Sequence, residues 1–251
     1  MKKICLFLVI MFLPFIIYAK EYDLKEINLS LSINEDWYVF TRGEFPESDE
    51  IQELGITEEF MNQYMDENSV YLDAMPKDFS YELILNTTSN TTEVYNMKNC
   101  SNAFLKEVVN GILEKISDAT ANVYDSGKNK YIVVSFYDTA SSYYIYRYYT
   151  IVNNMIYHFN IQKKSEISDN EKASLKRVVD TVDFTFLPQY QKEKNDIQKE
   201  INGNGKNEWW KNVLIDAGIG GLIGGVSSLL IAFIYKRKKA KLDKELEETS
   251  E

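Results

Sequence analysis

The sequence contains very little histidine, cysteine and proline. Among its 251 residues there are one His, two Cys and four Pro. So few imidazoles and thiols exclude a His-rich or Cys-rich metal site, and we expect no cofactor. The scarcity of Pro excludes a long Pro-rich tether.

Positive charge is also in short supply. Lys and Arg total 28 against 38 Asp and Glu, which gives a net charge of −10. Binding to nucleic acid phosphates requires a clustered basic surface. The balance therefore argues against nucleic acid as the main partner. Hydrophobic residues make up 45% and charged residues 26% of the chain, which is ordinary for a globular protein and rules out complete disorder.

The first of two apolar runs lies at the N-terminus. Lys2 and Lys3 precede an apolar run, residues 4–18, that only Pro14 interrupts, and Ala19 follows at a cleavage position. This order predicts a secretory signal over residues 1–19. An uncleaved anchor is the alternative, because Ile17 is bulkier than the usual residue two positions before the cleavage site. Fifteen apolar residues are fewer than the roughly 20 that a membrane span needs.

The second apolar run comprises the 23 residues from Val213 to Tyr235. As a helix it would extend about 35 Å, enough to cross a bilayer core of about 30 Å. Trp209 and Trp210 precede it at a position that suits the headgroup layer, and a basic cluster, residues 236–241, follows it. We expect a single transmembrane helix over residues 209–235, with the N-terminal domain outside the cell membrane and residues 236–251 as a cytoplasmic tail. A buried core helix is the alternative.

Glycines are concentrated in the expected span. Gly220 with Gly224, and Gly221 with Gly225, form two overlapping Gly-x-x-x-Gly pairs. This spacing lets helix backbones approach closely in lipid, so we expect a weak homodimer or a protein partner that packs on the span. The alternative is that glycine is simply frequent in membrane helices.

The part between the two runs has the pattern of one folded domain. We expect an exported domain over residues 20–188 and a polar stalk over residues 189–208. Alternating apolar residues predict strands, and apolar residues at helical spacing predict helices. The expected strands are 27–33, 38–41, 70–74, 81–86, 122–125, 131–138, 143–152, 155–161 and 183–187, and the expected helices are 57–68, 102–117 and 168–181. This order predicts an α+β fold, with an antiparallel sheet flanked by helices.

The two ends of this domain resemble the PsbP-like family. The alternating stretch from Ile27 to Ile33 is followed by Trp37, and Gly127-Lys128 precedes a strand. A hairpin then leads into residues 156–159, a capped helix and residues 182–184. The resemblance implies a helix–sheet–helix (α/β/α) sandwich and non-enzymatic accessory or binding roles. It transfers no functional residue, and helix 57–68 looks like an addition to the family pattern.

Acidic residues are concentrated between Glu44 and Glu82, where 12 acids accompany one base. The candidate binding residues in this segment are Glu58, Glu59, Asp66 and Glu67. They could face a basic partner, a cationic peptide or Ca²⁺, although no EF-hand loop is present. They could instead act as paired carboxylates of a hydrolase, but that chemistry needs a sheltered cleft and these acids fall on a polar helix face. A merely solvated helix face is the remaining alternative.

Tyrosines form the second candidate binding surface. Tyr144, Tyr146 and Tyr148 share one face of a strand, and Tyr is enriched at recognition surfaces. Strand propensity explains the same residues without function.

His158 faces away from Tyr157 and Phe159, and we expect a partly exposed histidine without a catalytic role, since no Gly-x-Ser-x-Gly elbow accompanies it. Cys100 is expected to pack at the start of helix 102–117.

The sequence thus predicts a non-catalytic, membrane-tethered binding or accessory module outside the cytoplasm, in a bacterial cell envelope. Two alternatives stay open. One is an extracytoplasmic hydrolase that uses paired carboxylates, and the other is a domain that binds Ca²⁺ or a small ligand.

Overall fold

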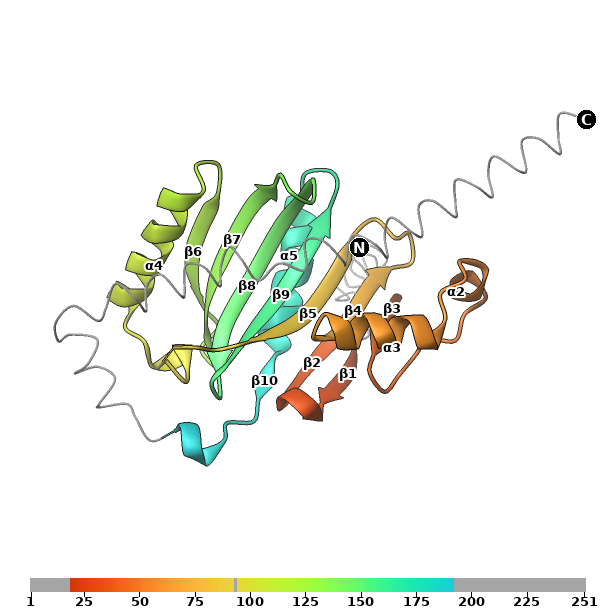
Figure 1. Cartoon of the computed structure of the whole chain (residues 1–251), viewed down its shortest axis with the longest axis horizontal. Coiled ribbons are helices and arrows are strands. Elements are labelled where there is room, and N and C mark those ends of the chain that lie inside the picture. The colour runs from red at the N-terminus through yellow and green to blue at the C-terminus, as the bar shows by residue number, and fades with distance from the viewer. Residues whose placement is uncertain (1–18, 93, 192–251) are drawn as a thin grey trace, which may run out of the picture.

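The computed structural model describes residues 19–92 and 94–191, which form two antiparallel sheets and four α-helices (Figure 1). The larger sheet has the strand order β3-β4-β5-β9-β8-β7-β6, and the smaller has the order β1-β2-β10. The large sheet contains β3 (Trp37–Thr41), β4 (Val70–Pro76), β5 (Glu82–Ser89), β6 (Thr120–Asp125), β7 (Lys130–Asp138), β8 (Tyr143–Val152) and β9 (Met155–Lys163). The small sheet contains β1 (Ala19–Leu24), β2 (Leu29–Asn34) and β10 (Asp183–Phe184).

Each of the longer helices begins at a residue whose side chain caps it. The helices are α2 (Asp49–Glu53), α3 (Glu58–Glu67), α4 (Asn102–Lys115) and α5 (Asp169–Thr181). The hydroxyls of Thr57 and Ser101 accept backbone N–H bonds at the starts of α3 and α4. Ser168 and Glu171 form a reciprocal capping box at the start of α5. These bonds satisfy N–H groups that have no partner inside the helix.

The large sheet carries helices on both faces. Helix α5 and the small sheet cover one face, and α3 and α4 lie over opposite ends of the other face (Figure 1). Leu175, Val178 and Val179 of α5 join the largest apolar cluster. Helix α4 packs on the β7–β8 end, and α3 packs on the β3–β4 end. The arrangement is therefore α+β with antiparallel sheets, as expected from the order of elements.

The turn between β8 and β9 connects several distant segments. Asn153 and Asn154 both have left-handed backbones, with φ of 51° and 63°, which a two-residue hairpin requires. The Asn153 side chain donates to Thr185 O at 2.9 Å and accepts from Leu187 N at 2.9 Å. Asn154 Oδ1 accepts from Asn90 Nδ2 at 2.8 Å. The turn thereby holds the end of the domain and the segment after β5 against the sheet.

The central prediction of the fold is confirmed. β7, β8 and β9 pair consecutively as an antiparallel meander, and the helices expected over 102–117 and 168–181 pack on the sheet. Cys100 is buried directly before α4, as expected. The apolar residues of the first expected strand, Ile27, Leu29, Leu31 and Ile33, are all buried.

Two elements near the N-terminus differ from the prediction. β1 was not expected, because its alternation contains only Tyr22 and Leu24 and its strand character depends on pairing with β2. Ile27 belongs to a 3₁₀ turn rather than to a strand, and Asn28 follows it with φ of 52°. Asn tolerates this left-handed backbone and so separates β1 from β2.

Several predictions fall outside residues 19–92 and 94–191. They are the signal segment up to residue 18, the stalk after residue 191, the span, its four glycines and the cytoplasmic tail. Within the described part, no helix is both long and apolar enough to cross a membrane.

Candidate functional site

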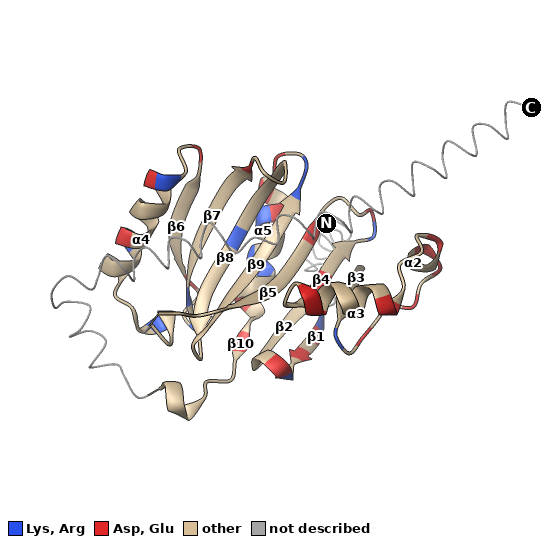
Figure 2. Cartoon of the chain, viewed as in Figure 1, with Lys and Arg blue, Asp and Glu red and all other residues tan. Residues whose placement is uncertain are grey.

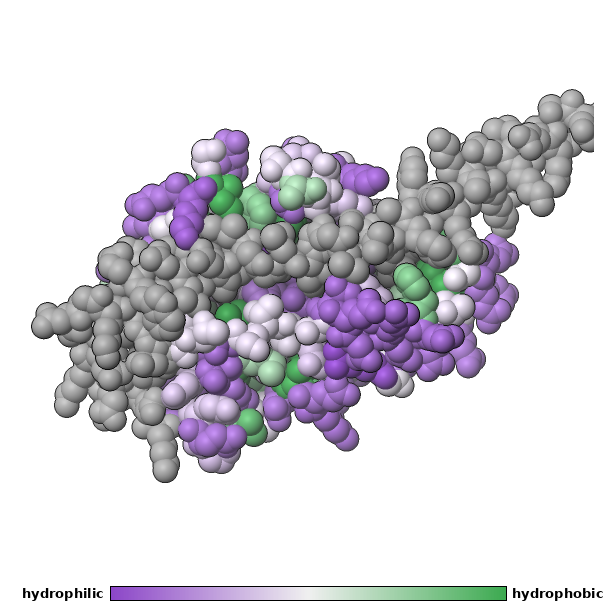
Figure 3. All heavy atoms as spheres, in the orientation of Figure 1, coloured by the Kyte–Doolittle hydropathy of each residue, from purple (hydrophilic) through white to green (hydrophobic). Residues whose placement is uncertain are grey.

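The acids predicted as a binding surface lie on the outer side of α3. Glu58, Glu59, Asp66 and Glu67 are all exposed, and together with the acids of α2 they mark one end of the molecule (Figure 2). Asp66 lies 3.6 Å from the Arg42 guanidinium, and Glu67 accepts from Gln63 at 2.8 Å. The surface over α3 is hydrophilic (Figure 3). These four carboxylates face solvent and do not share a cleft, so their arrangement does not favour the hydrolase alternative.

The tyrosines of β8 are buried to different degrees. Tyr148 is only 3% exposed and packs edge-to-face against Tyr124 and Tyr131, with ring centroids 5.6 and 6.1 Å apart. Tyr144 and Tyr146 are half-buried beside α5, where Lys172 lies 6.0 Å from the Tyr146 ring. Tyr148 therefore belongs to the core, and only Tyr144 and Tyr146 of the three can reach a partner.

The expectation that His158 is partly exposed is wrong. Its side chain has no exposed area, its Nε2 lies 3.0 Å from Thr88 Oγ1, and Nδ1 has no hydrogen-bond partner. Burial, reinforced by the positive charge of Arg147, lowers the pKa of His158 well below its ordinary value. The prediction failed because this face of the sheet is also buried, which alternation along β9 does not reveal.

A band of buried polar side chains crosses the middle of this face. The strand register places Arg147 of β8 opposite Asn160 of β9, and His158 of β9 opposite Asn86 of β5. Arg147 Nε donates to Asn160 Oδ1 at 2.6 Å, and Asn160 Nδ2 donates to Asn86 Oδ1 at 3.0 Å. The polar band separates the apolar cluster under α4 from the cluster under α3.

The polar band ends under α3, where its last members are two carboxyl groups. Asp73 of β4 and Glu82 of β5 have no exposed area, and the Tyr64 side chain of α3 is 5% exposed. Gln162 of β9 donates from Nε2 to Glu82 Oε2 at 3.0 Å. Both carboxyl oxygens of Asp73, Oε1 of Glu82 and the Tyr64 hydroxyl lack a hydrogen bond of ordinary geometry. A buried carboxylate without partners is costly, so the charged form of this pair is strongly disfavoured.

Burial favours the protonated form of the carboxyl pair. Burial raises the pKa of Asp73 to about 7, although the adjacent Glu82 and Tyr64 groups oppose the rise. Burial, followed by the adjacent Asp73 carboxyl, raises the pKa of Glu82 well above its ordinary value. Two neighbouring carboxyls in an apolar site cannot both ionise, so they retain a proton between them.

The sequence contains an indication that these two acids are buried. It was overlooked because all acids between Glu44 and Glu82 were counted together. Asp73 and Glu82 were counted with the solvated acids of the same segment, yet Asp73 falls within the apolar strand β4 and Glu82 begins β5 directly before Leu83, Ile84 and Leu85. An acid inside an apolar strand indicates a buried group. Pairing between the two strands was needed to show that they meet under α3.

A cleft opens on the other face of the molecule, between α5 and the ends of β2, β3 and β4. We call it the α5 cleft. Its volume is about 510 Å³, within the range of pockets that hold small ligands. Its lining is Ala19, Ser32, Asn34, Trp37, Pro76, Asp78, Ser80, Tyr81, Ser174, Arg177, Val178, Asp180 and Thr181.

Aromatic rings and polar groups both line the α5 cleft. Trp37 and Tyr81 contact edge-to-face, with ring centroids 5.4 Å apart. Arg177 donates to Ser174 Oγ at 2.9 Å, and Thr181 Oγ1 accepts from Ser32 N at 2.9 Å. The cleft can therefore receive a group with an apolar face and hydrogen-bonding edges. Its lining includes one Arg and two Asp, so it does not select strongly for charge.

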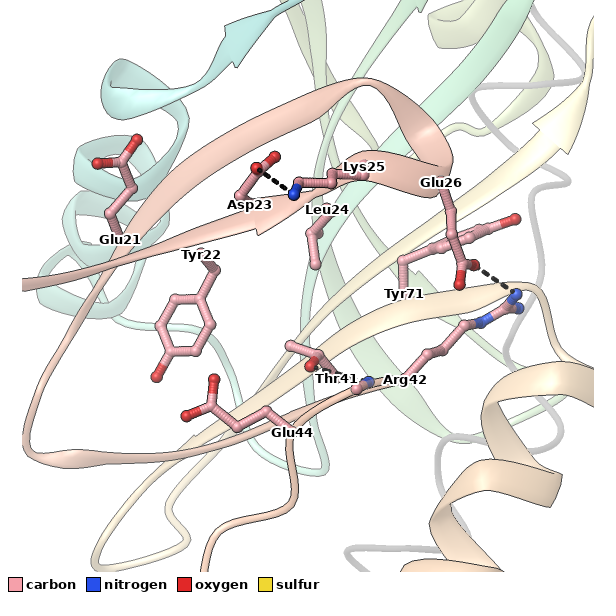
Figure 4. A pocket seen from close by; sticks show the side chains of 11 residues that line it. Glu21, Tyr22, Asp23, Leu24, Lys25, Glu26, Thr41, Arg42, Glu44 and Tyr71 are labelled. Carbon is pink, nitrogen blue, oxygen red and sulfur yellow. Dashed lines mark hydrogen bonds and ion pairs between the residues drawn. The ribbon is translucent and has the colours of Figure 1, made fainter.

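A second pocket, of about 390 Å³, lies between β1 and the end of β3 (Figure 4). Its cationic side chains are already engaged. Arg42 contacts Glu26 at 3.2 Å and lies 4.0 Å from the Tyr71 ring, and Lys25 lies 3.9 Å from Asp23. Arg42 also donates to Met65 O at 3.2 Å and to Val70 O at 3.0 Å. We interpret this pocket as a set of polar contacts that connects β1 to the α3 region.

The described residues contain no group of three or more His, Cys, Asp or Glu side chains that could hold a metal ion. The α5 cleft contains hydroxyl groups and carboxylates but no His, Lys or Cys.

Comparisons with known proteins give distant structural matches. The sequence matches no protein-family model and none of the curated proteins. A crystal structure of a protein from Bacteroides thetaiotaomicron is similar at 11% identity and a TM-score of 0.37, over 66% of this chain and 48% of that one. The solution structure of cyanobacterial PsbP from Synechocystis is similar at 8% identity and a TM-score of 0.32, over 68% of this chain and 94% of that one. The chain thus spans about half the length of the Bacteroides protein.

Proposed function

We propose that this protein is a non-catalytic binding module of the cell envelope, tethered by a single C-terminal span with its folded domain outside the cytoplasm. The signal-like N-terminus, the apolar run 213–235 and the basic residues after it support the topology. In this proposal the two overlapping glycine pairs of the span pack on a second copy or on a partner's span.

We further propose that the domain has the PsbP-like arrangement. Two features support this refinement. The large antiparallel sheet carries α5 on one face and α3 and α4 on the other, and the resemblance in sequence covers both ends of the domain. Helix α3 and the acidic segment around it are then additions to that arrangement.

The observation that carries the binding proposal is the α5 cleft. It combines a Trp and a Tyr ring with several hydrogen-bonding side chains in a volume of about 510 Å³. Aromatic rings with convergent polar groups are typical of binding sites. The partner that fits is a neutral or weakly charged group with an apolar face and polar edges. The two carboxylates of the lining are already bonded, Asp78 to the Ser80 N–H and Asp180 to Lys176, so we assign the cleft to binding rather than to catalysis.

Photo-crosslinking in intact cells tests this proposal. A photoreactive amino acid replaces either Arg177, which is exposed at the cleft, or Lys106, which is exposed on α4. We expect a discrete adduct from position 177 that is absent from position 106. We also expect Ser80→Trp to abolish that adduct, because Ser80 is an exposed residue of the lining and an indole there would fill the cleft. Equal adducts from both positions, or an adduct that persists with Ser80→Trp, would contradict binding in the cleft.

A further inference from the structure

We propose that Asp73 and Glu82 form a proton-binding pair that holds helix α3 on the sheet, so that loss of their protons releases the α2–α3 segment. The proposal is independent of the α5 cleft, which lies on the opposite face. It follows from the position of the pair, the contacts around it and the way in which α3 is held.

The pair lies at the contact between α3 and the sheet. Met61, Tyr64 and Met65 of α3 are buried against an apolar cluster that includes Phe40 of β3 and Ile84 of β5. Asp73 pairs directly with Ile84 in the strand register. The carboxyls therefore lie within the surface that α3 covers, and water reaches them only when α3 moves away.

The described groups around the pair leave its negative charge uncompensated. Helix α3 presents Tyr64, and β8 presents Tyr143, whose hydroxyl also lacks a partner. The negative charges of Asp73 and Glu82 add to burial in raising the pKa of Tyr64 well above its ordinary value. β9 presents the neutral Gln162, and Tyr38 of β3 faces Ser48 and Glu50 instead. Arg147 bonds to Asn160, and Arg42 contacts Asp66 and the α3 backbone.

Protons provide the hydrogen bonds that the two carboxyl groups need, and a metal ion does not fit between them. A proton on Glu82 gives it a donor for Asp73, while its other oxygen accepts from Gln162. A buried Ca²⁺ takes six to eight oxygen ligands, and the described residues bring together no third acid here.

The sign of the pH dependence follows from the direction of the two pKa shifts. When α3 is docked, the pKa of Asp73 is about 7 and that of Glu82 is well above its ordinary value. When α3 opens, both groups meet water and return to about 4. The docked state binds more protons, so its stabilisation is complete below pH 4 and is lost as pH rises through 7. For each proton, the opening equilibrium rises about tenfold per pH unit within this window.

His158, a further buried titratable group of the polar band, has the opposite sign. Its pKa in the folded protein lies below the ordinary value, so it destabilises the fold as pH falls below about 6.5. Loosening of α3 on raising the pH therefore cannot arise from His158.

Amide hydrogen exchange on the full-length protein in detergent tests the proposal. The quantity to follow is the protection factor of α3, which corrects for the intrinsic pH dependence of exchange. In the wild type we expect it to fall at least tenfold between pH 5 and pH 8, to values below those of β9. In the double variant Asp73→Asn with Glu82→Gln, which keeps shape but cannot ionise, we expect a change smaller than twofold.

The matched control is the double variant Glu58→Gln with Glu59→Gln. It also replaces two carboxyl groups by amides, but on the exposed face of α3. We expect this variant to keep the wild-type dependence of α3 protection on pH. Constant α3 protection in the wild type would overturn the proposal, even if the buried variant fails to fold. If the control variant loses the pH dependence of α3 protection, that dependence arises from surface charge and not from the buried pair. Equal protection of α3 and β9 at pH 8 would show that only the whole domain unfolds, which would also overturn the proposal.

Discussion

At the scale of single residues, the buried polar groups distinguish this domain from a purely apolar sandwich. Asn, Gln, His and Arg side chains occupy positions on β5, β8 and β9 that a simple core would fill with aliphatic residues. Arg147 bonds to Asn160, which lies directly opposite it, and Asn160 bonds diagonally to Asn86, which lies opposite His158. Because an unpaired buried group costs about 1–3 kcal/mol, such a network favours one register over its neighbours.

Asn153 offers a test of how backbone conformation and side-chain bonds combine at one residue. Asn153→Ala loses the bonds to Thr185 and Leu187 and forces Ala into a left-handed backbone, so we expect a loss of about 2–3 kcal/mol. Asn153→Gly loses the same bonds but adopts that backbone freely, so it should cost about 1 kcal/mol less. Urea unfolding of both variants measures the difference. Equal losses would show that the backbone is not strained there.

Residue-level prediction from the sequence succeeded where alternation or spacing decides burial. Leu29, Leu31 and Ile33 of the predicted strand 27–33 are buried, and the hairpin predicted before residues 156–159 is present at Asn153-Asn154. It failed for His158, Asp73 and Glu82. Their burial depends on which helix covers which part of the sheet, and that is decided by residues far away in the sequence.

At the scale of elements, the strongest predictions came from segments with a sustained period. The apolar residues of α4 recur at helical spacing and Ser101 caps its start, so local sequence and tertiary packing agree. β1 was missed because its apolar alternation contains only Tyr22 and Leu24, and α2 was missed because it has only five residues. β1 is a strand only because β2 pairs with it along its whole length.

Val109 tests the face of α4 that was identified from the sequence. It is 8% exposed and packs in the cluster under α4. Val109→Asp would bury an unpaired carboxylate, and we expect a loss of about 3–5 kcal/mol, seen as a large drop in melting temperature. The neighbouring Asn110→Asp introduces a negative charge on the exposed side of the same helix and should leave melting nearly unchanged. Similar melting of the two variants would show that α4 presents a different face.

At the scale of the whole molecule, the two faces of the domain serve different purposes in this account. The face under α3 and α4 contains the polar band and the proton-binding pair, and the α5 cleft on the other face offers the proposed binding site. The sequence predicted neither feature, since each is assembled from elements that are distant along the chain. The sequence does predict a membrane tether, because a membrane span and its flanks are local patterns, and this prediction lies outside the described residues.

Protease treatment of intact cells tests most directly the claim that the domain is displayed outside on a membrane tether. The cells carry the full-length protein with an epitope after Glu251, and their outer envelope layers are made permeable to the protease. The account predicts loss of the full-length band and a short tagged fragment that contains the span and tail, while a cytoplasmic marker protein stays intact. A full-length band that survives until the membrane is lysed would contradict the account.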